Sequence, residues 1–207
     1  MLDLENEYYK AGYKVIAGCD EAGRGCLCGP VIASAVVFPI EYKNNLINDS
    51  KKLTPKKRDE LYNVILKDAL AIGICAIEAD EIDKINIYEA SKKAMIESLK
   101  QINNVNIDCI LTDAMPLEFN NLKSVPIIKG DSKALSIAAA SIIAKVTRDR
   151  LLDNYSYIYP DYKFNKHKGY STKLHVELIN KYGIIKKFYR ETYSPVKEVL
   201  YPKITLF

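Results

Sequence analysis

Two adjacent acids follow a short apolar run near the start of the chain. Residues 15–17 are Val-Ile-Ala, and Asp20 and Glu21 follow within four residues. Carboxylates at the end of a buried strand are costly to desolvate without a positive partner. Neighbouring acids also oppose each other's ionisation. A Gly-Arg-Gly turn at 23–25 comes next, and glycine lets a backbone approach a ligand closely. The pattern favours a hard metal ion beside a phosphate-bearing substrate.

Two further acids are predicted at strand ends. Asp113 follows Ile-Leu-Thr at 110–112, and Asp131 follows the stretch 125–130. Because ligands collect beyond the strand ends of α/β sheets, we expect these acids to meet the first pair in one pocket. An oxygen-rich pocket suits Mg²⁺ or Mn²⁺ and disfavours zinc. Two such ions would activate a water and stabilise the leaving oxygen in phosphodiester hydrolysis.

Each of the later acids also has a purely structural alternative. Asp131 could cap the helix that follows it, because acids are favourable at helix N-termini. Asp113 could belong to a turn before Pro116. The tripeptide Asp-Ser-Lys occurs at 49–51 and again at 131–133, each time before a predicted helix. Spacing alone does not say which of the two aspartates is the ligand.

The expected substrate contacts are basic and aromatic. Arg24 lies between two glycines, and residues 166–173 interleave cations with Tyr170. Cations contact phosphates, and a ring stacks on a sugar or a base. Residues 151–207 carry 10 basic and 5 acidic side chains, whereas the rest of the chain is close to neutral. This basic quarter suits a polyanion, although an excess of this size also occurs on ordinary solvated surfaces.

Strands alternating with helices predict an α/β domain with a mixed sheet. The segment 137–144 is small or apolar on every side, which predicts a central helix enclosed by protein. Residues 155–170 are expected to form a loop. Strands are expected over 13–19, 31–38, 69–77, 105–111 and 125–128, and helices from residue 54 and over 88–102, 132–153 and 172–182.

Composition excludes several classes of protein. No apolar stretch approaches the roughly 20 residues of a membrane span, and the first ten residues are acidic and polar rather than a secretory signal. A cytoplasmic protein is therefore expected. No phosphate-loop motif is present, which disfavours nucleoside triphosphate hydrolysis. Of the 5 cysteines, most lie in apolar runs and are expected to be buried free thiols.

Six motifs, in one order, resemble ribonuclease HII. They are DEAGRG at 20–25, GPV at 29–31, DSKKL at 49–53, TDA at 112–114, the long run GDSKALSIAAASIIAKVTRD at 130–149 and HKGYSTK at 167–173. The resemblance implies a ribonuclease H-like mixed sheet flanked by helices, with a C-terminal helical extension. It also implies a catalytic domain over 1–183 and a tail over 184–207 packed on it or extending from it.

The resemblance assigns roles to individual residues. The family's four catalytic, metal-binding acids fall on Asp20, Glu21, Asp113 and Asp131, which favours the second Asp-Ser-Lys tripeptide. Its glycine-arginine-glycine motif, which reads the 2′-hydroxyl of a ribonucleotide, falls on Gly23, Arg24 and Gly25. Its tyrosine at the sugar on the DNA side of the junction falls on Tyr170. Candidate phosphate contacts are Lys51, Lys52, Lys133, Lys145, Lys168 and Lys173.

The implied activity is that of an endonuclease acting in DNA replication and repair. With Mg²⁺ or Mn²⁺ it would hydrolyse the RNA strand of RNA–DNA hybrids and cut 5′ to ribonucleotides embedded in duplex DNA, leaving 3′-hydroxyl and 5′-phosphate ends. Physically this is coherent, because only the 2′-hydroxyl distinguishes the two sugars. The chain departs from the family at Cys26 and Cys28, commonly proline and alanine, and at Tyr189, usually histidine.

Two other functions remain open from sequence. One is a resolvase- or integrase-like DNA nuclease on a similar fold; the other is a non-catalytic module that binds hybrids. Four carboxylates facing phosphates would not help a pure binder, which argues against the second. A monomer is expected, with no membrane contact. A replication clamp is a candidate partner through the tail motif at 204–207.

Overall fold

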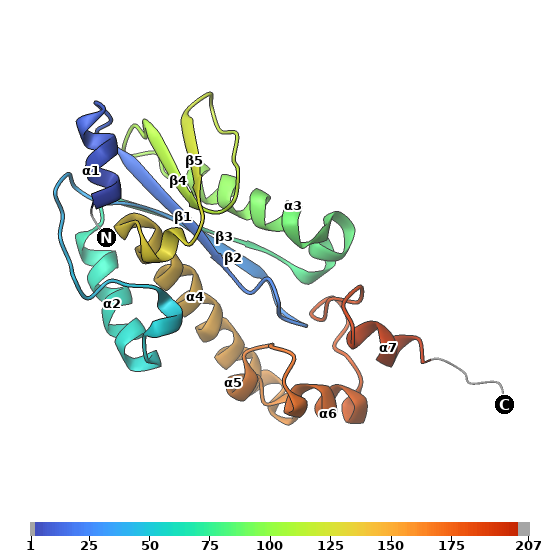
Figure 1. The fold of residues 1–207 in the computed structure, drawn as a ribbon. Helices are drawn as coiled ribbons and strands as arrows, with labels where there is room; N and C mark the ends of the chain where they lie inside the picture. Colours follow the sequence, from blue (N-terminus) through green and yellow to red (C-terminus); the bar gives the residue numbers. More distant parts are fainter. Residues whose placement is uncertain (1–2, 203–207) are drawn as a thin grey trace.

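The computed structural model describes residues 3–202 and contains one five-stranded mixed sheet in the order β3-β2-β1-β4-β5 (Figure 1). The first three strands pair antiparallel, and β1, β4 and β5 run parallel. This confirms the predicted α/β class. The strands are β1 Ile16–Ala22, β2 Val31–Val37, β3 Ala71–Ile77, β4 Cys109–Asp113 and β5 Lys123–Ile127.

Helices cover both faces of this sheet. The α-helices are α1 Asp3–Lys10, α2 Pro55–Asp68, α3 Ala79–Lys100, α4 Leu135–Ile158, α5 Phe164–His167, α6 Lys173–Tyr182 and α7 Val196–Leu200, with short 3-10 turns η1 Ser50–Lys52, η2 Gly130–Ser132 and η3 Pro160–Tyr162. On one face, α3 packs Ala94 and Leu99 against strand residues such as Ala33. On the other face, α4 packs between the sheet and α2.

The central helix α4 lies directly on β1, as its small side chains predict. A Cβ at Gly18 would stand 2.3 Å from the carbonyl carbon of Ser136, so only glycine allows the two backbones to approach this closely. The contact extends the buried core along nearly the whole sheet-facing length of α4. Because β1 carries the first two acids and α4 follows the last one, this packing also fixes their relative positions.

Two element predictions differ from the structure. The helix expected to begin at 88 begins at Ala79, because Asn86, with a φ of 66°, only interrupts α3. The Asn86 side chain accepts hydrogen bonds from the N–H groups of Tyr88 and Glu89, so it restarts the helix where sequence placed its beginning. Residues 155–170 are not a loop, since α4 continues to Ile158 and short helical turns follow.

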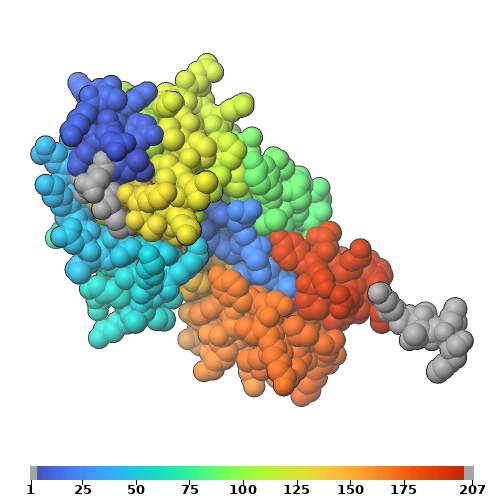
Figure 2. Space-filling model, in the orientation of Figure 1, coloured from blue at the N-terminus to red at the C-terminus, as the bar shows by residue number. Residues whose placement is uncertain are grey.

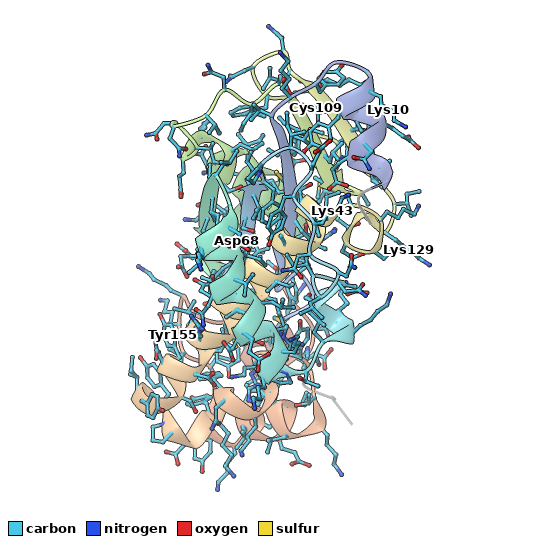
Figure 3. All side chains as sticks on the ribbon, turned by 90° about the vertical axis from the view of Figure 1, so that its left-hand side faces the viewer. Lys10, Lys43, Asp68, Cys109, Lys129 and Tyr155 are labelled. Atoms are coloured by element: carbon cyan, nitrogen blue, oxygen red, sulfur yellow. The ribbon has the colours of Figure 1, made fainter. Side chains whose placement is uncertain are left out.

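The C-terminal elements gather at the far end of α4 from α1 (Figures 1 and 2). Figure 3, which is turned by 90° from Figure 1, agrees with this arrangement, since Cys109 is labelled near α1 and Tyr155 near the C-terminal helices. A separate apolar cluster there joins Leu27 and Leu152 to Phe188 and Val196. The division into a domain over 1–183 and a tail over 184–207 stays a prediction. No helix within the described residues is long and apolar enough to cross a membrane.

Candidate active site

Three of the predicted acids come from neighbouring elements: two from the parallel strands β1 and β4, and one from the turn η2. In the sheet Cys19 lies opposite Thr112, so Asp20 and Asp113, the next residue on each strand, reach the same edge. Asp131 lies in η2, after Lys129 turns the chain with a φ of 57°. The Gly130 N–H donates a 2.7 Å hydrogen bond to Asp113 Oδ1 and so ties η2 to the end of β4.

The acids are buried and incompletely paired. Asp20 is 4% exposed and Asp131 is 5% exposed. Asp20 Oδ1 accepts a 2.8 Å hydrogen bond from the Glu21 N–H. Glu21 Oε1 lies 3.4 Å from Arg24 Nη1, but its Oε2 is buried with no hydrogen-bond partner among residues 3–202. An orphaned carboxylate oxygen is costly unless a cation or a donor reaches it.

Burial and mutual repulsion raise the pKa of three of these carboxyls. For Asp20 burial is the main cause of the raised pKa, and the charges of Glu21 and Asp113 add to it. Burial also raises the pKa of Glu21, against the lowering effect of the Arg24 cation. The pKa of Asp131 rises through burial and then the charge of Asp113. The site therefore concentrates negative charge that its own cations do not balance.

The donor set matches a hard divalent cation in its chemistry. Within the described part of the chain, no three acidic, histidine or cysteine side chains already form a closed ligand group. The carboxylates therefore do not form a finished cage, and Glu21 Oε2 is a buried oxygen with no hydrogen-bond partner within residues 3–202. Oxygen ligands of this kind are those that Mg²⁺ and Mn²⁺ prefer.

A cleft of about 420 Å³ joins acids, turn and tyrosine. Among the predicted residues, Glu21, Asp113 and Tyr170 line it, together with the turn at 23–25 and two lysines. The complete lining is Glu21, Ala22, Gly23, Arg24, Gly25, Ser50, Lys51, Asp113, Ser141, Lys145 and Tyr170. Asp20 and Asp131 do not contribute to the lining. The structure therefore brings acids and candidate substrate contacts from five separate segments to one surface.

The glycines of the turn have different reasons to be glycine. Gly23 has a φ of +98°, and a Cβ there would stand 2.1 Å from Arg148 Nε. A Cβ at Gly25 would meet no protein atom within 4 Å, and its φ is not positive. Folding therefore requires glycine at 23, whereas at 25 the open space in front of the backbone faces the cleft. The Arg24 side chain between them is 46% exposed.

Tyr170 also lines the cleft, its backbone forms a β-bridge with Cys26 just after the turn, and the residue is 41% exposed. Lys145 Nζ lies 5.1 Å from the ring centroid and also pairs with Asp149 at 2.7 Å. The Tyr170 backbone is held at both ends, because its N–H donates to His167 O and its carbonyl accepts from His175 Nδ1. The ring is thus presented to solvent from a fixed backbone.

The predicted lysines fall into two groups. Lys51 and Lys145 line the cleft, and Lys51 Nζ lies 3.8 Å from Asp131 Oδ2. Lys168 pairs with Asp153 and borders a neighbouring cleft of about 350 Å³ that Lys145 also lines. The remaining three lie outside both clefts and are exposed: Lys52, Lys133 and Lys173. Phosphate contact by any of the six stays a prediction.

Two serines of the cleft were not predicted. Ser50 and Ser141 lie with their Oγ atoms 2.9 Å apart, and Ser141 hydrogen-bonds Asp20 and works against the rise in its pKa. A signal did exist, since Ser141 is a polar residue inside an otherwise apolar helical run. All 5 cysteines are free thiols, 4 of them buried.

Comparison with known proteins identifies the family of this chain. The model of the family described as Ribonuclease HII matches residues 17–195. The ribonuclease HII of Listeria monocytogenes is 50% identical over 198 residues, covering 96% of this chain and 75% of the relative. That of Bacillus subtilis is 50% identical over 197 residues, covering 95% and 76%.

Solved structures show the same fold. Ribonuclease H2 from Pyrococcus horikoshii superposes with a TM-score of 0.75 at 24% identity, covering 89% of this chain and 96% of that one. Ribonuclease HII from Archaeoglobus fulgidus, solved in a complex with PCNA, gives 0.73 at 25% identity, covering 86% and 95%. The chain belongs to the ribonuclease HII family and is an endoribonuclease of the ribonuclease H type.

Proposed function

We propose that the protein hydrolyses the RNA strand of RNA–DNA hybrids and cuts 5′ to single ribonucleotides embedded in duplex DNA. The products would carry 3′-hydroxyl and 5′-phosphate ends. One observation carries the proposal: a single cleft is lined by Glu21 and Asp113, by the turn at 23–25 and by Tyr170. Groups that would read a sugar therefore stand beside groups that would act on its phosphate.

The two reading groups suit a junction between RNA and DNA. The N–H groups of Arg24 and Gly25 donate no hydrogen bond within residues 3–202, and nothing covers the Cα of Gly25. They are therefore free to bind a 2′-hydroxyl, the group that only RNA has. In the same cleft, the Tyr170 ring would press on the next sugar, and an additional hydroxyl on that sugar would weaken binding. Neither contact depends on the base, so recognition would be independent of sequence.

The proposed cofactor is Mg²⁺ or Mn²⁺, held by Asp20, Glu21, Asp113 and Asp131. The all-carboxylate donor set and the orphaned Glu21 Oε2 support this assignment. When bound, the ion supplies Lewis-acid stabilisation of phosphate charge and a more acidic water. The chain itself holds the carboxylates in place through the Asp113–Gly130 hydrogen bond. Lys51 and Lys145 are the cleft cations proposed to position phosphates.

The proposed setting is the cytoplasm, where a monomer would act on hybrids and on ribonucleotide-containing duplexes during DNA replication and repair. The clamp contact also remains a proposal. It is supported by the PCNA complex of the Archaeoglobus fulgidus protein, and its candidate motif at 204–207 lies outside the described residues.

The decisive test uses a DNA duplex with one internal ribonucleotide, incubated with Mg²⁺ or Mn²⁺, with the cut mapped at nucleotide resolution. We expect one cut 5′ to the ribonucleotide and none in the matched all-DNA duplex. Cleavage of branched all-DNA substrates would instead favour a resolvase-like nuclease. Tight binding without cleavage by folded protein would contradict the catalytic role of the acids.

A further inference from the structure

Two fully buried arginines lie behind the cleft. Arg148 on α4 and Arg190 after α6 are both 0% exposed. Buried arginines are normally paired with acids, because an unpaired buried charge is costly. Here every hydrogen bond that Arg148 makes within residues 3–202 goes to a backbone carbonyl. Those of Arg190 do the same, apart from one to the hydroxyl of Tyr193. The two guanidinium groups therefore serve mainly to hold backbone carbonyls in place.

Between them, the two arginines hold three consecutive carbonyls. Arg148 donates to Cys28 O at 2.9 Å and to Pro30 O at 3.0 Å. Arg190 donates to Gly29 O, the carbonyl between them, at 3.0 and 3.2 Å. The segment 28–30 is thus a shared anchor that both side chains reach.

From this anchor each arginine reaches a different wall of the cleft. Arg190 donates to Gly23 O and to Arg24 O, both at 2.8 Å. Arg148 donates at 2.7 Å to Lys168 O, two residues before Tyr170. The turn at 23–25 and the segment before Tyr170 are therefore connected through one continuous set of hydrogen bonds.

Two glycines, Gly23 and Gly169, allow both walls of the cleft to pack directly against the Arg148 side chain. A Cβ at Gly23 would stand 2.1 Å from Arg148 Nε, and a Cβ at Gly169 would stand 3.1 Å from Arg148 Nη2. Both glycines have a positive φ, +98° and +82°. The residue just before Arg24 and the residue just before Tyr170 therefore pack against the same guanidinium, which adds to the direct hydrogen bond from the Leu27 N–H to Gly169 O in holding the two walls together.

The hydrogen bonds of Arg190 also orient the turn. A trans peptide is planar, with its C=O and the next N–H on opposite sides. Because the carbonyls of Gly23 and Arg24 point to Arg190, the N–H groups of Arg24 and Gly25 point away from it. These are the donors that have no partner within the described part of the chain.

We propose that Arg148 and Arg190 are positioning residues that help to set the spacing between the turn at 23–25 and Tyr170, and so determine how fast a single RNA–DNA junction is cut relative to a continuous hybrid. This rests on the proposed function of those two walls. A guanidinium offers a rigid planar fork of donors, whereas lysine offers a compact ammonium on a flexible stem. Lysine would retain the buried charge but would not hold three separated carbonyls at once.

The test compares Arg148→Lys and Arg190→Lys with the wild-type chain. The control is Arg150→Lys, an exposed arginine whose partner is Asp59. For each protein, kcat/KM is measured on a duplex with one ribonucleotide and on a continuous RNA–DNA hybrid, and folding is checked by circular dichroism and thermal melting. We expect the junction-to-hybrid ratio to fall about tenfold in both test variants, as for loss of charge-assisted hydrogen bonds, and to stay unchanged in the control.

A milder variant covers the case in which the buried substitutions prevent folding. Tyr193→Phe removes a hydroxyl that donates to Arg24 O at 3.1 Å and leaves both arginines in place. We expect the same ratio to fall by about threefold, as for one neutral hydrogen bond.

Equal losses on both substrates, with an unchanged ratio in the folded variants, would overturn this inference and leave the arginines a structural role only. Wild-type protein that ignores the single ribonucleotide would overturn the proposed function, and this inference with it. The two failures are distinct because the second needs no variant.

Discussion

Lys51 Nζ lies 3.8 Å from Oδ2 of Asp131, so the two Asp-Ser-Lys tripeptides of the chain meet beside the active site. Their aspartates nonetheless have different surroundings. Asp49 Oδ1 accepts a 2.9 Å hydrogen bond from the Lys51 N–H and caps η1, whereas Asp131 follows the sheet edge that carries the other acids. In the first tripeptide, Asp49 therefore stabilises the turn that places Lys51 near the site. In the second, Asp131 itself supplies a carboxylate.

This difference predicts unequal effects of the same substitution. Asp131→Asn should lower kcat on a ribonucleotide-containing duplex by roughly 100-fold or more, because a metal ligand supplies several kcal/mol to the transition state. Asp49→Asn should retain most of the activity, since an amide oxygen can still cap η1. Steady-state rates for both variants check this. A larger loss for Asp49→Asn than for Asp131→Asn would reverse the assignment.

The raised pKa of Asp20 predicts how stability depends on pH without metal. The folded carboxyl holds its proton to higher pH than the unfolded one, so the free energy of unfolding falls as pH rises from about 4 towards 7. Asp20→Asn should remove this penalty and stabilise the protein at pH 7 by roughly 1 kcal/mol or more, while abolishing cleavage. Urea unfolding in EDTA at pH 5 and pH 7 measures the effect. A less stable variant at pH 7 would contradict it.

Substituting two different glycines should affect stability in one case and activity in the other. Gly18→Ala should destabilise the protein by several kcal/mol, because its Cβ would stand 2.3 Å from the Ser136 backbone. Gly25→Ala should melt like the wild type, since its Cβ meets nothing within 4 Å. It should nevertheless lower kcat/KM on the ribonucleotide duplex by about tenfold or more, as for loss of a hydrogen bond to substrate. Unimpaired cleavage by Gly25→Ala would remove that residue from the substrate site.

The buried histidine pair predicts sensitivity to acid. His175 stacks on His167 at 3.8 Å, and burial, followed by that neighbour, lowers the pKa of His175 to about 4. Its folded pKa lies below the unfolded value, so stability is complete above about pH 6.5 and is lost as pH falls towards 4. Between pH 7 and pH 4 the wild type should lose roughly 3 kcal/mol more than His175→Asn, whose amide can still donate to Tyr170 O. Parallel pH profiles would contradict the assignment.

The central part of this site could be predicted from sequence because its parts are local. Asp20, Glu21 and the turn at 23–25 are close together in the sequence. Asp113 and Asp131 each follow a predicted strand, which indicated where they would lie. Their convergence then followed from the parallel pairing of β1 with β4. Sequence did not predict the buried arginines, because carbonyl acceptors are present at every residue and leave no pattern.

The helices that sequence predicted incompletely or not at all also depend on contacts between residues far apart in the chain. Asn86 at a positive φ was hidden inside a long helical pattern, so α3 was predicted too short. Helix α1 was not predicted, although its Glu5 accepts hydrogen bonds from Ser136 N–H and Oγ at the start of α4. The continuation of α4 to Ile158 depends on packing against C-terminal residues such as Phe188. Such contacts join segments whose separation along the chain hides them.

The hydrogen bond from Arg190 to Gly23 O spans 167 positions of sequence. During translation the strands and the central helix leave the ribosome well before Arg190 does. The turn that would grip a ribonucleotide therefore gains this support only after Arg190 has been synthesised. A nascent chain that has not reached Arg190 carries all four acids but lacks the hydrogen bonds that support the turn, so the proposed sugar discrimination would be acquired after the acids are in place.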